Sequence, residues 1–452
     1  MTQTLDRGFR PVLSNPSFRS LWGAQWLALI AQNAINFIQL VLIEQITGST
    51  IHLGITVVAF TLPGVIFSPL AGVVADRFPK KWVMVISNSS RVLVALGYVV
   101  VLTAVKGSWR LVPIYVLTFL MSTLSQFFAP AEAAMIPLLV GEKRLIAANA
   151  LFSLTIVLSQ MLGLMFLGPI IVRLLRPGGG FIVISLMYLG AAILVALLPS
   201  DRHQLRPRSD APSPWHQMWV EFKEGLSFIG TQPAIKAAIT QLVTIMTLVM
   251  IMAMLMPGYA ARVLGMSAED VVVVFAPVGV GMLIATGLMG RLGHGLRRIG
   301  FDYIGMLFAG LAFIVMGMLS LGYPRMPHPL LSVLPRMDIS LTTATILLVT
   351  VIGVCVAGTN ILAQTTVQRD SPAYIRGRVL SVQFTLTNLV GILPVLALGG
   401  LADLIGIPHV LEIVGIGTIL AMALSFVLAG PSGRPAWLSR RDSGGQTDAD
   451  LT

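Results

Sequence analysis

Long apolar segments alternate with short polar ones along almost the whole chain. Each apolar segment is uninterrupted and about 20 residues long, the length that an α-helix needs to cross the hydrocarbon layer of a bilayer. An outer-membrane barrel would show alternating segments of about 10 residues instead. The pattern predicts twelve membrane-spanning helices, at residues 20–43, 52–75, 82–104, 111–131, 146–172, 181–199, 236–260, 271–290, 301–322, 341–363, 378–402 and 409–430.

A polar stretch separates the predicted spans into two sets of six. It begins with arginines and prolines and continues, from Trp215 to Ile229, with apolar residues among charged ones, which is typical of a helix lying on the membrane surface. Glycine and basic residues follow both the second and the eighth span, so we expect two pseudo-symmetric six-helix bundles around a central pathway. The predicted parts are a cytosolic N-terminal segment (1–19), an N-terminal bundle (20–199), a cytosolic linker with the amphipathic helix (200–234), a C-terminal bundle (235–430) and a disordered cytosolic tail (431–452).

The composition agrees with an all-α integral membrane protein. Of the 452 residues, 56% are hydrophobic and 11% are charged, whereas a soluble domain has about 25% charged residues. A soluble multidomain enzyme is therefore excluded. The net charge of +11 arises from short basic clusters between apolar segments rather than from one continuous face, so their expected partner is the lipid bilayer and not nucleic acid.

The distribution of basic residues predicts the orientation. If the N-terminus is cytosolic, 23 of the 30 Lys and Arg residues fall on the cytosolic side of the predicted spans. This is the asymmetry of the positive-inside rule. We therefore expect a multi-pass protein of the bacterial cytoplasmic (inner) membrane with both termini in the cytosol.

Residues that could form a metal site or a catalytic centre are scarce. Cys355 is the only cysteine, and the six histidines form no cluster with metal-ligand spacing. No glycine-rich phosphate loop occurs, so ATP-driven pumping is not supported. His203 with Asp210, and His328 with Asp338, share loops without an evident third partner. The sequence predicts no cofactor, no metal site and no enzymatic activity, with a membrane-bound transferase as the alternative.

A compact group of residues follows the second predicted span. Its glycine would let two helices approach closely, its carboxylate lies at the membrane edge, and three cations follow on a tight turn. One hypothesis is a conformational latch, in which the carboxylate pairs with basic groups or a helix N-terminus of the opposite bundle in one state and releases in another. The alternative is a cytosolic turn that obeys the positive-inside rule. The predicted latch residues are Gly72, Asp76, Arg77, Lys80 and Lys81.

This loop resembles the signature between the second and third helices of the major facilitator superfamily. Further stretches are similar to its macrolide-efflux and siderophore-exporter-like branch. They are Asn15 to Trp22, Thr47-Gly48-Ser49, Phe128-Ala129-Pro130-Ala131 through Ile136-Pro137 to Ala148-Asn149, and Arg376-Gly377-Arg378-Val379. The resemblance spans residues 15–430. It implies the twelve-helix major facilitator fold and export of a small organic substrate in exchange for protons.

Three positions depart from the pattern of that branch. Pro79 stands where the loop signature usually has glycine, which fixes φ near about −65° there. The acid often found midway along the first helix is replaced, since the chain reads Ala31-Gln32-Asn33. The antiporter signature of the fifth helix is reduced to Gly163 and Gly168-Pro169. If the missing acid carries protons in relatives, this chain must carry them elsewhere or not at all.

Amide side chains form a stripe along the first predicted span. Gln25, Gln32, Asn36 and Gln39 fall within an arc of about 60° around the helix axis at ~100° per residue. Lipid does not tolerate such a stripe, so it should face the protein interior. We expect these residues, with amides and threonines of later spans, to line the substrate cavity; the alternative is that they join helices to one another. The predicted cavity residues are Gln25, Gln32, Asn33, Asn36, Gln39, Thr244, Asn360, Gln364, Gln383 and Thr387.

Arg91 is the most unusual charged residue within a predicted span. It lies about 13 Å into the third span at ~1.5 Å per residue. An ionised group at that depth is a functional candidate, and Glu132 at the end of the next span is its expected partner in coupling. The alternative is that Arg91 reaches the lipid headgroups and Glu132 lies in a loop. Glu44, Asp403 and Glu412 map near the outer ends of spans, where we expect solvated rim residues.

Together these features predict a secondary transporter that works by alternating access, with its substrate site near the midplane between the bundles. A mostly neutral, amide-lined cavity suits an amphipathic or hydrophobic organic compound, such as a drug, a macrolide or a siderophore. Protons are the expected coupling ion, and a monomer is the expected state. A carrier of lysophospholipid or another lipid is the alternative within the same fold, and a non-transporting scaffold or sensor is a further one.

Overall fold

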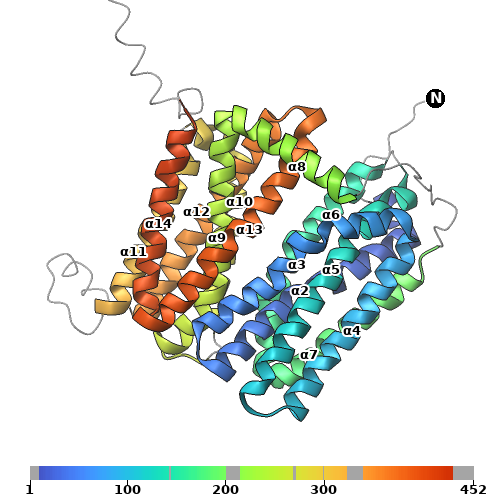
Figure 1. Ribbon diagram of the computed structural model, residues 1–452, viewed down its shortest axis with the longest axis horizontal. Coiled ribbons are helices and arrows are strands. Elements are labelled where there is room, and N and C mark those ends of the chain that lie inside the picture. Colours follow the sequence, from blue (N-terminus) through green and yellow to red (C-terminus); the bar gives the residue numbers. More distant parts are fainter. Residues whose placement is uncertain are drawn as a thin grey trace, which may run out of the picture. The chain divides into compact units, whose positions relative to one another are not determined.

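The computed structural model describes residues 10–141, 144–199, 214–267, 271–298, 300–322 and 340–430. Within these ranges the chain forms helices joined by turns and short connections, and it contains no strand. It divides into two compact units, one of Met1–Gly48 and Ile55–Gln217 and the other of Ser49–Gly54 and Met218–Thr452. Each unit is a bundle of long helices that run side by side (Figure 1).

The helices are divided between the two units. Those of the first unit are α1 (Arg10–Leu13), α2 (Pro16–Thr47), α3 (Thr50–Arg77, from Ile55 onward), α4 (Lys80–Ala104), the 3-10 helix η1 (Gly107–Arg110), α5 (Leu111–Val140), α6 (Leu145–Gln160), the π-helix η3 (Met161–Leu167) and α7 (Gly168–Ala196). Those of the second unit are α8 (Pro214–Thr231, from Met218 onward), α9 (Pro233–Arg262), α10 (Val271–Arg298), α11 (Phe301–Gly322), α12 (Leu341–Asp370), α13 (Ala373–Ile405) and α14 (Ile407–Leu428).

Both ends of α2 follow from local sequence. The side-chain oxygen of Asn15 accepts hydrogen bonds from the backbone N–H groups of Ser17 (3.0 Å) and Phe18 (3.3 Å). Pro16 takes the first helical position, where no N–H partner is needed. Gly48 ends the helix with φ 57°, a left-handed conformation that glycine adopts without strain. Two of the stretches that resemble the family thus define the length of α2.

The fifth and sixth predicted spans contain two interruptions. The N–H of Gly168 donates to the carbonyl of Gly163, five residues earlier, and this bond makes η3 a π-helix. The widened turn lies against α2, because a Cβ built on Gly163 would stand 2.6 Å from the Cβ of Asn33. Helical geometry breaks again at Arg176, with φ 56°, just before Pro177, so α7 contains the end of one span and the whole of the next.

The prediction of an all-α integral membrane chain is confirmed. Eleven helices of the described residues are long and apolar enough to cross a membrane. At the eighth predicted span, α10 contains a shorter apolar stretch, Ala276–Met289. The first long helices of the two units, α2 and α9, are the most enclosed, since 61% of the most apolar window of each is buried. The two units therefore place their first long helix alike, as pseudo-symmetric bundles should.

Small residues bring the helices of the second unit close together. A Cβ on Gly310 of α11 would stand 2.8 Å from the carbonyl oxygen of Gly415 on α14.

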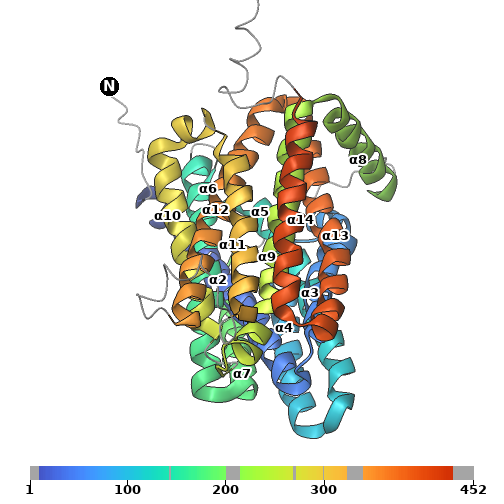
Figure 2. The same cartoon turned by 90° about the vertical axis from the view of Figure 1, so that its left-hand side faces the viewer.

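The stretch predicted as a surface helix is α8, which lies at one end of the long helices (Figure 2). Gly225 of α8 packs on α13, where a Cβ would stand 2.9 Å from the carbonyl oxygen of Arg378. Arg378 also forms an ion pair with Glu224, so α8 is docked by both packing and charge.

Several predicted boundaries differ from the observed ones or cannot be compared. α2 begins at Pro16 rather than at residue 20, because Asn15 caps it there. α5 continues through Pro130 and Pro137 to Val140, beyond the predicted end at residue 131. Proline is tolerated in membrane helices where neighbouring groups satisfy the carbonyls it leaves free. Residues 1–9, most of the linker (200–213) and the tail (431–452) lie outside the described residues.

Candidate functional site

Four helices of the first unit enclose a cluster of polar and aromatic side chains. One face of α4 is buried and carries Asn88, Arg91 and Tyr98 at positions three and seven residues apart. The other members of the cluster come from α2 (Gln32 and Gln39), from α5 (Thr118, Phe128 and Glu132) and from α7 (Phe181 and Tyr188). The cluster is thus set by helix periodicity on each of the four helices.

Arg91 lies at the centre of this cluster and is only 2% exposed. Its Cζ stands 5.4 Å from the ring centroid of Phe128 and 5.2 Å from that of Tyr188. A guanidinium between two aromatic faces is stabilised by their negative π-faces, and more so where water is excluded. Nη1 donates to Oδ1 of Asn88 at 3.3 Å, one turn back on α4, while Nε has no hydrogen-bond partner.

Glu132 is the buried acid of the same cluster and is 7% exposed. Its Oε1 has no hydrogen-bond partner, and no Arg91 nitrogen lies within the 4.0 Å of an ion pair with it. The alternative in which Arg91 reaches the headgroups and Glu132 lies in a loop is wrong, because both side chains are buried within helices. An acid and a cation buried within membrane-spanning helices are candidates for a function.

A second network joins three helices beside this cluster. Nε2 of Gln39 donates to the hydroxyl of Tyr98 at 2.7 Å, and that hydroxyl is 2.8 Å from Oγ1 of Thr118. The ring of Tyr98 stacks on Phe181, with centroids 4.3 Å apart and planes inclined by 6°. Gln39 is 1% exposed, so in this structure it joins helices, which is the alternative that the amide stripe left open.

The other amides of α2 differ in their hydrogen-bond partners. Nε2 of Gln32 donates to Oδ1 of Asn36 at 3.1 Å, and the hydroxyl of Tyr188 donates to Oε1 of Gln32 at 3.2 Å. The stripe therefore reaches Arg91 through Tyr188. Asn33 donates to the carbonyl of Leu29 in its own helix, and Gln25 is 1% exposed with its Oε1 unpartnered.

The predicted cavity residues of the second unit are partly brought together. Nε2 of Gln383 on α13 donates to Oε1 of Gln364 on α12 at 2.9 Å. Thr387, one turn further along α13, is buried and its hydroxyl has no partner. Thr244 donates to the carbonyl of Thr240 in its own helix, and Asn360 is half-buried. Gln383 and Gln364 thus join α13 to α12, as the helix-joining alternative expects, and the cavity role of these residues stays a prediction.

The predicted latch residues lie at the end of α3 and the start of α4. Nζ of Lys81 donates to the carbonyl of Leu198 at 2.6 Å, so this cation neutralises the C-terminal end of α7 in its own unit. Arg77 is exposed and Lys80 is half-buried. A Cβ on Gly72 would meet no heavy atom of the described chain within 4 Å, so no close helix approach occurs there. The side chain of Asp76 lies outside the described residues, and its latch role stays a prediction.

Comparison with known proteins places the fold in a family. The Major Facilitator Superfamily profile matches residues 21–395. The chain belongs to this family. It is therefore a multi-pass membrane transporter whose substrate is a small molecule, and the predicted resemblance is confirmed.

Its relatives in the Major Facilitator Superfamily are distant. The chain is 25% identical over 414 residues to an uncharacterized MFS-type transporter, YfiS of Bacillus subtilis (strain 168), covering 89% of this chain and 88% of that protein. It is 25% identical over 383 residues to the enterobactin exporter EntS of Escherichia coli (strain 536), covering 84% and 83%. Among solved structures, the nucleoside transporter NupG has a TM-score of 0.66 at 12% identity, covering 92% and 99%. A POT family transporter in complex with 5-aminolevulinic acid has a TM-score of 0.64 at 12% identity, covering 91% and 95%.

Sequence reasoning missed the aromatic half of the cluster in this superfamily member. Tyr98 lies seven residues after Arg91, which places both on one face of α4, and this spacing could have found it. Phe128 and Tyr188 give no local signal, because aromatic residues are frequent on many helix faces. The expectation of solvated rim acids is wrong for Glu44, which is 6% exposed, and Asp403 is engaged in several hydrogen bonds.

Proposed function

We propose that the chain exports an amphipathic or hydrophobic organic compound in exchange for protons by alternating access, with Glu132 and Arg91 as the coupling groups. The observation that carries this proposal is the burial of both charged side chains in the first unit of a transporter, with polar atoms left without partners. Keeping such groups in a membrane helix costs free energy, so they are retained where a function uses them.

The proposed coupling follows from the charges of the pair. Deprotonated Glu132 offsets the buried charge of Arg91, whereas protonated Glu132 leaves that charge held by Phe128, Tyr188 and Asn88 alone. The two protonation states therefore favour different positions of the guanidinium. Because Tyr188 also binds Gln32, movement of Arg91 would be transmitted to the amide stripe of α2.

The substrate class rests on the amide stripe and on similarity. Neutral amides in an apolar surrounding suit a compound with both polar and apolar parts. The similarity to an enterobactin exporter supports the outward direction and an organic substrate of this kind. The proposal keeps the cavity role for the predicted amides and threonines other than Gln39, which donates to the hydroxyl of Tyr98.

The proposed setting is the bacterial inner membrane, with both termini in the cytosol. The excess of basic residues on the side of the N-terminus supports this orientation.

The test is the accumulation of labelled amphiphiles, including a macrolide and a siderophore, in efflux-deficient cells. Cells expressing the wild type, Glu132→Gln or Arg91→Ala would be compared with and without an ionophore that collapses the proton gradient. We expect lower accumulation only with the wild type, and loss of this difference with the ionophore. Wild-type export that persists undiminished with the ionophore would contradict proton coupling.

The same assay separates the lipid carrier from the exporter. If no soluble amphiphile is exported, transfer of labelled lysophospholipid between the leaflets of vesicles containing the purified protein would be measured. Transfer that depends on Glu132 would replace the organic export proposal with the lipid-handling one.

A further inference from the structure

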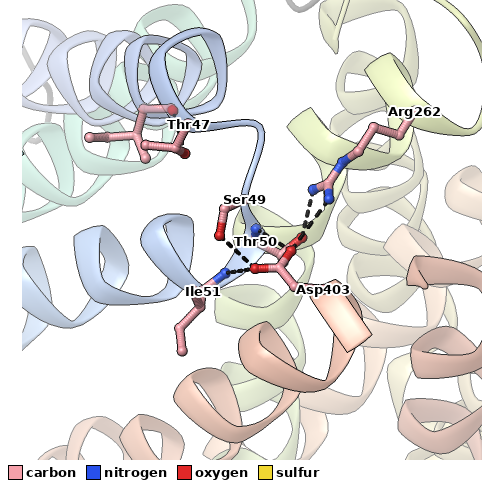
Figure 3. Close-up of polar contacts among 7 residues, drawn as sticks. Thr47, Ser49, Thr50, Ile51, Arg262 and Asp403 are labelled. Atoms are coloured by element: carbon pink, nitrogen blue, oxygen red, sulfur yellow. Dashed lines mark hydrogen bonds and ion pairs between the residues drawn. The ribbon is translucent and has the colours of Figure 1, made fainter. Parts of the chain in front are cut away.

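Asp403 near the end of α13 caps the first turn of α3. Its Oδ1 accepts a hydrogen bond from the backbone N–H of Thr50 at 2.7 Å. Its Oδ2 accepts one from the N–H of Ile51 at 3.1 Å and one from the hydroxyl of Ser49 at 2.5 Å (Figure 3). A carboxylate at a helix N-terminus is favoured by the free N–H groups and by the helix dipole. All these residues belong to the second unit, because Ser49–Gly54 clusters with it.

Arg262 at the end of α9 joins the same contact. Its Nη1 is 3.4 Å from Oδ1 of Asp403, and its Nη2 donates to Oγ1 of Thr50 at 2.6 Å (Figure 3). Gly258, one turn earlier on α9, leaves the space that the guanidinium occupies, since a Cβ there would overlap it. The cation thus bridges the acid and the helix turn that the acid caps.

Glycines bring the backbones together beneath these polar groups. A Cβ on Gly399 of α13 would stand 3.1 Å from the carbonyl oxygen of Thr50, and a Cβ on Gly54 would stand 3.3 Å from that of Val395. Side chains at either position would separate the first turn of α3 from α13. The contact is therefore built by both a polar cap and a seam of small residues.

The division of α3 between the units gives this contact a mechanical meaning. The first turn of α3 clusters with the second unit, and the remainder of the helix, from Ile55 to Arg77, with the first. α3 thus runs continuously from one unit into the other, while the contacts of Asp403 and Arg262 hold its first turn to α13 and α9. The polar groups can be released to water, because the side chains of Asp403 and Arg262 are 26% and 33% exposed.

We propose that Asp403, Arg262 and the first turn of α3 form a releasable latch, the Asp403 latch, which is closed in this structure and opens in another state of the transport cycle. The inference rests on the proposed alternating access, but not on the identity of the substrate or of the coupling ion. It assigns a role to an acid that lies far from the buried Arg91 cluster in sequence.

The experiment measures opening directly by thiol labelling. Cys355, the only cysteine, would be replaced by alanine, and Val395→Cys would be the reporter, since Val395 is 0% exposed and contacts Gly54. In purified protein, Asp403→Asn should raise the rate of labelling by a water-soluble maleimide about tenfold, because it removes a charge-assisted cap and an ion pair.

Two controls separate latch opening from general loosening. Asp370→Asn removes another acid of the second unit, which is 2.6 Å from Arg369 at the surface, and should leave the reporter unchanged. A second reporter, Val349→Cys, is 0% exposed on α12 and should label at the same slow rate with or without Asp403→Asn.

Gly258→Ala provides an independent variant, because it displaces Arg262 and leaves Asp403 in place. It should raise the labelling rate of the Val395 reporter about threefold, a smaller effect since the helix cap survives. An unchanged rate in both Asp403→Asn and Gly258→Ala, or an equal rise at Val349→Cys, would overturn the latch. The labelling assay needs no substrate, so its result can be interpreted even if the export assay fails.

Discussion

The guanidinium of Arg91 lies over the ring of Tyr188, with its Cζ 5.2 Å from the ring centroid, although the two residues belong to helices far apart in the chain. Tyr188 in turn donates a hydrogen bond to Gln32 of α2. A buried charge is thus connected to the polar stripe that we propose for the substrate. This connection makes the pair the first place to test coupling.

Arg91→Ala should lower export about tenfold or more, because a desolvated cation–π contact alone contributes about 2 kcal/mol. Arg91→Lys should retain more activity, since it keeps the charge but loses the planar group between two rings. Export rates normalised to the amount of protein in the membrane would be compared. Equal and unimpaired export by both variants would remove Arg91 from the mechanism.

Glu132→Gln should separate export from the proton gradient. The substitution keeps the shape of the side chain but holds it permanently neutral, so the two protonation states can no longer alternate. Export by wild type in vesicles should rise with an imposed pH gradient, whereas the variant should show the same low rate with and without it. Substrate binding to detergent-solubilised variant, within about threefold of wild type, would show that the protein is folded.

Asp76→Asn should strongly reduce export while leaving membrane insertion intact. The neutral side chain cannot make the charge contacts that the predicted latch at the end of α3 requires. Matched cells expressing Arg77→Gln would show how much of the effect comes from the cations of the same turn. Normal export by Asp76→Asn would contradict the latch and favour the alternative, a cytosolic turn that obeys the positive-inside rule.

Tyr98→Phe should distinguish a helix-joining role of Gln39 from a cavity role. The variant retains the stack on Phe181 but leaves Gln39 and Thr118 without their shared partner, at a cost of about 1–3 kcal/mol in the free energy of unfolding. Thermal unfolding in detergent should show the loss, with the order of preference among substrates unchanged. A changed order of preference would favour cavity lining.

Gly163→Ala should destabilise the first unit by about 1–3 kcal/mol, because its Cβ would overlap α2 at Asn33 and at the carbonyl of Ile30. Gly417→Ala on α14 is the matched control, since a Cβ there meets nothing within 4 Å. That substitution should instead stabilise its helix by up to about 1 kcal/mol. Unfolding temperatures that move in the same direction would contradict the packing account.

The sequence alone determined that this is an integral membrane protein, that its spans form two sets, and that Arg91 is a candidate functional residue. Apolar length, charge asymmetry and an arginine deep within a span are properties of single segments, so they can be seen without knowing which helices meet. Local chemistry also determined the ends of α2, where Asn15 and Gly48 act on their own backbone neighbourhood.

Only the tertiary structure decided which groups surround Arg91 and which acid caps the first turn of α3. The contact of Arg91 with Phe128 and Tyr188 depends on the rotation and the register of three helices, which local periodicity does not specify. Asp403 was expected to be a solvated acid, yet it caps a helix turn 353 residues earlier in the chain. A carboxylate near a helix end can face either water or a distant N-terminus, and packing of the backbones selects between them.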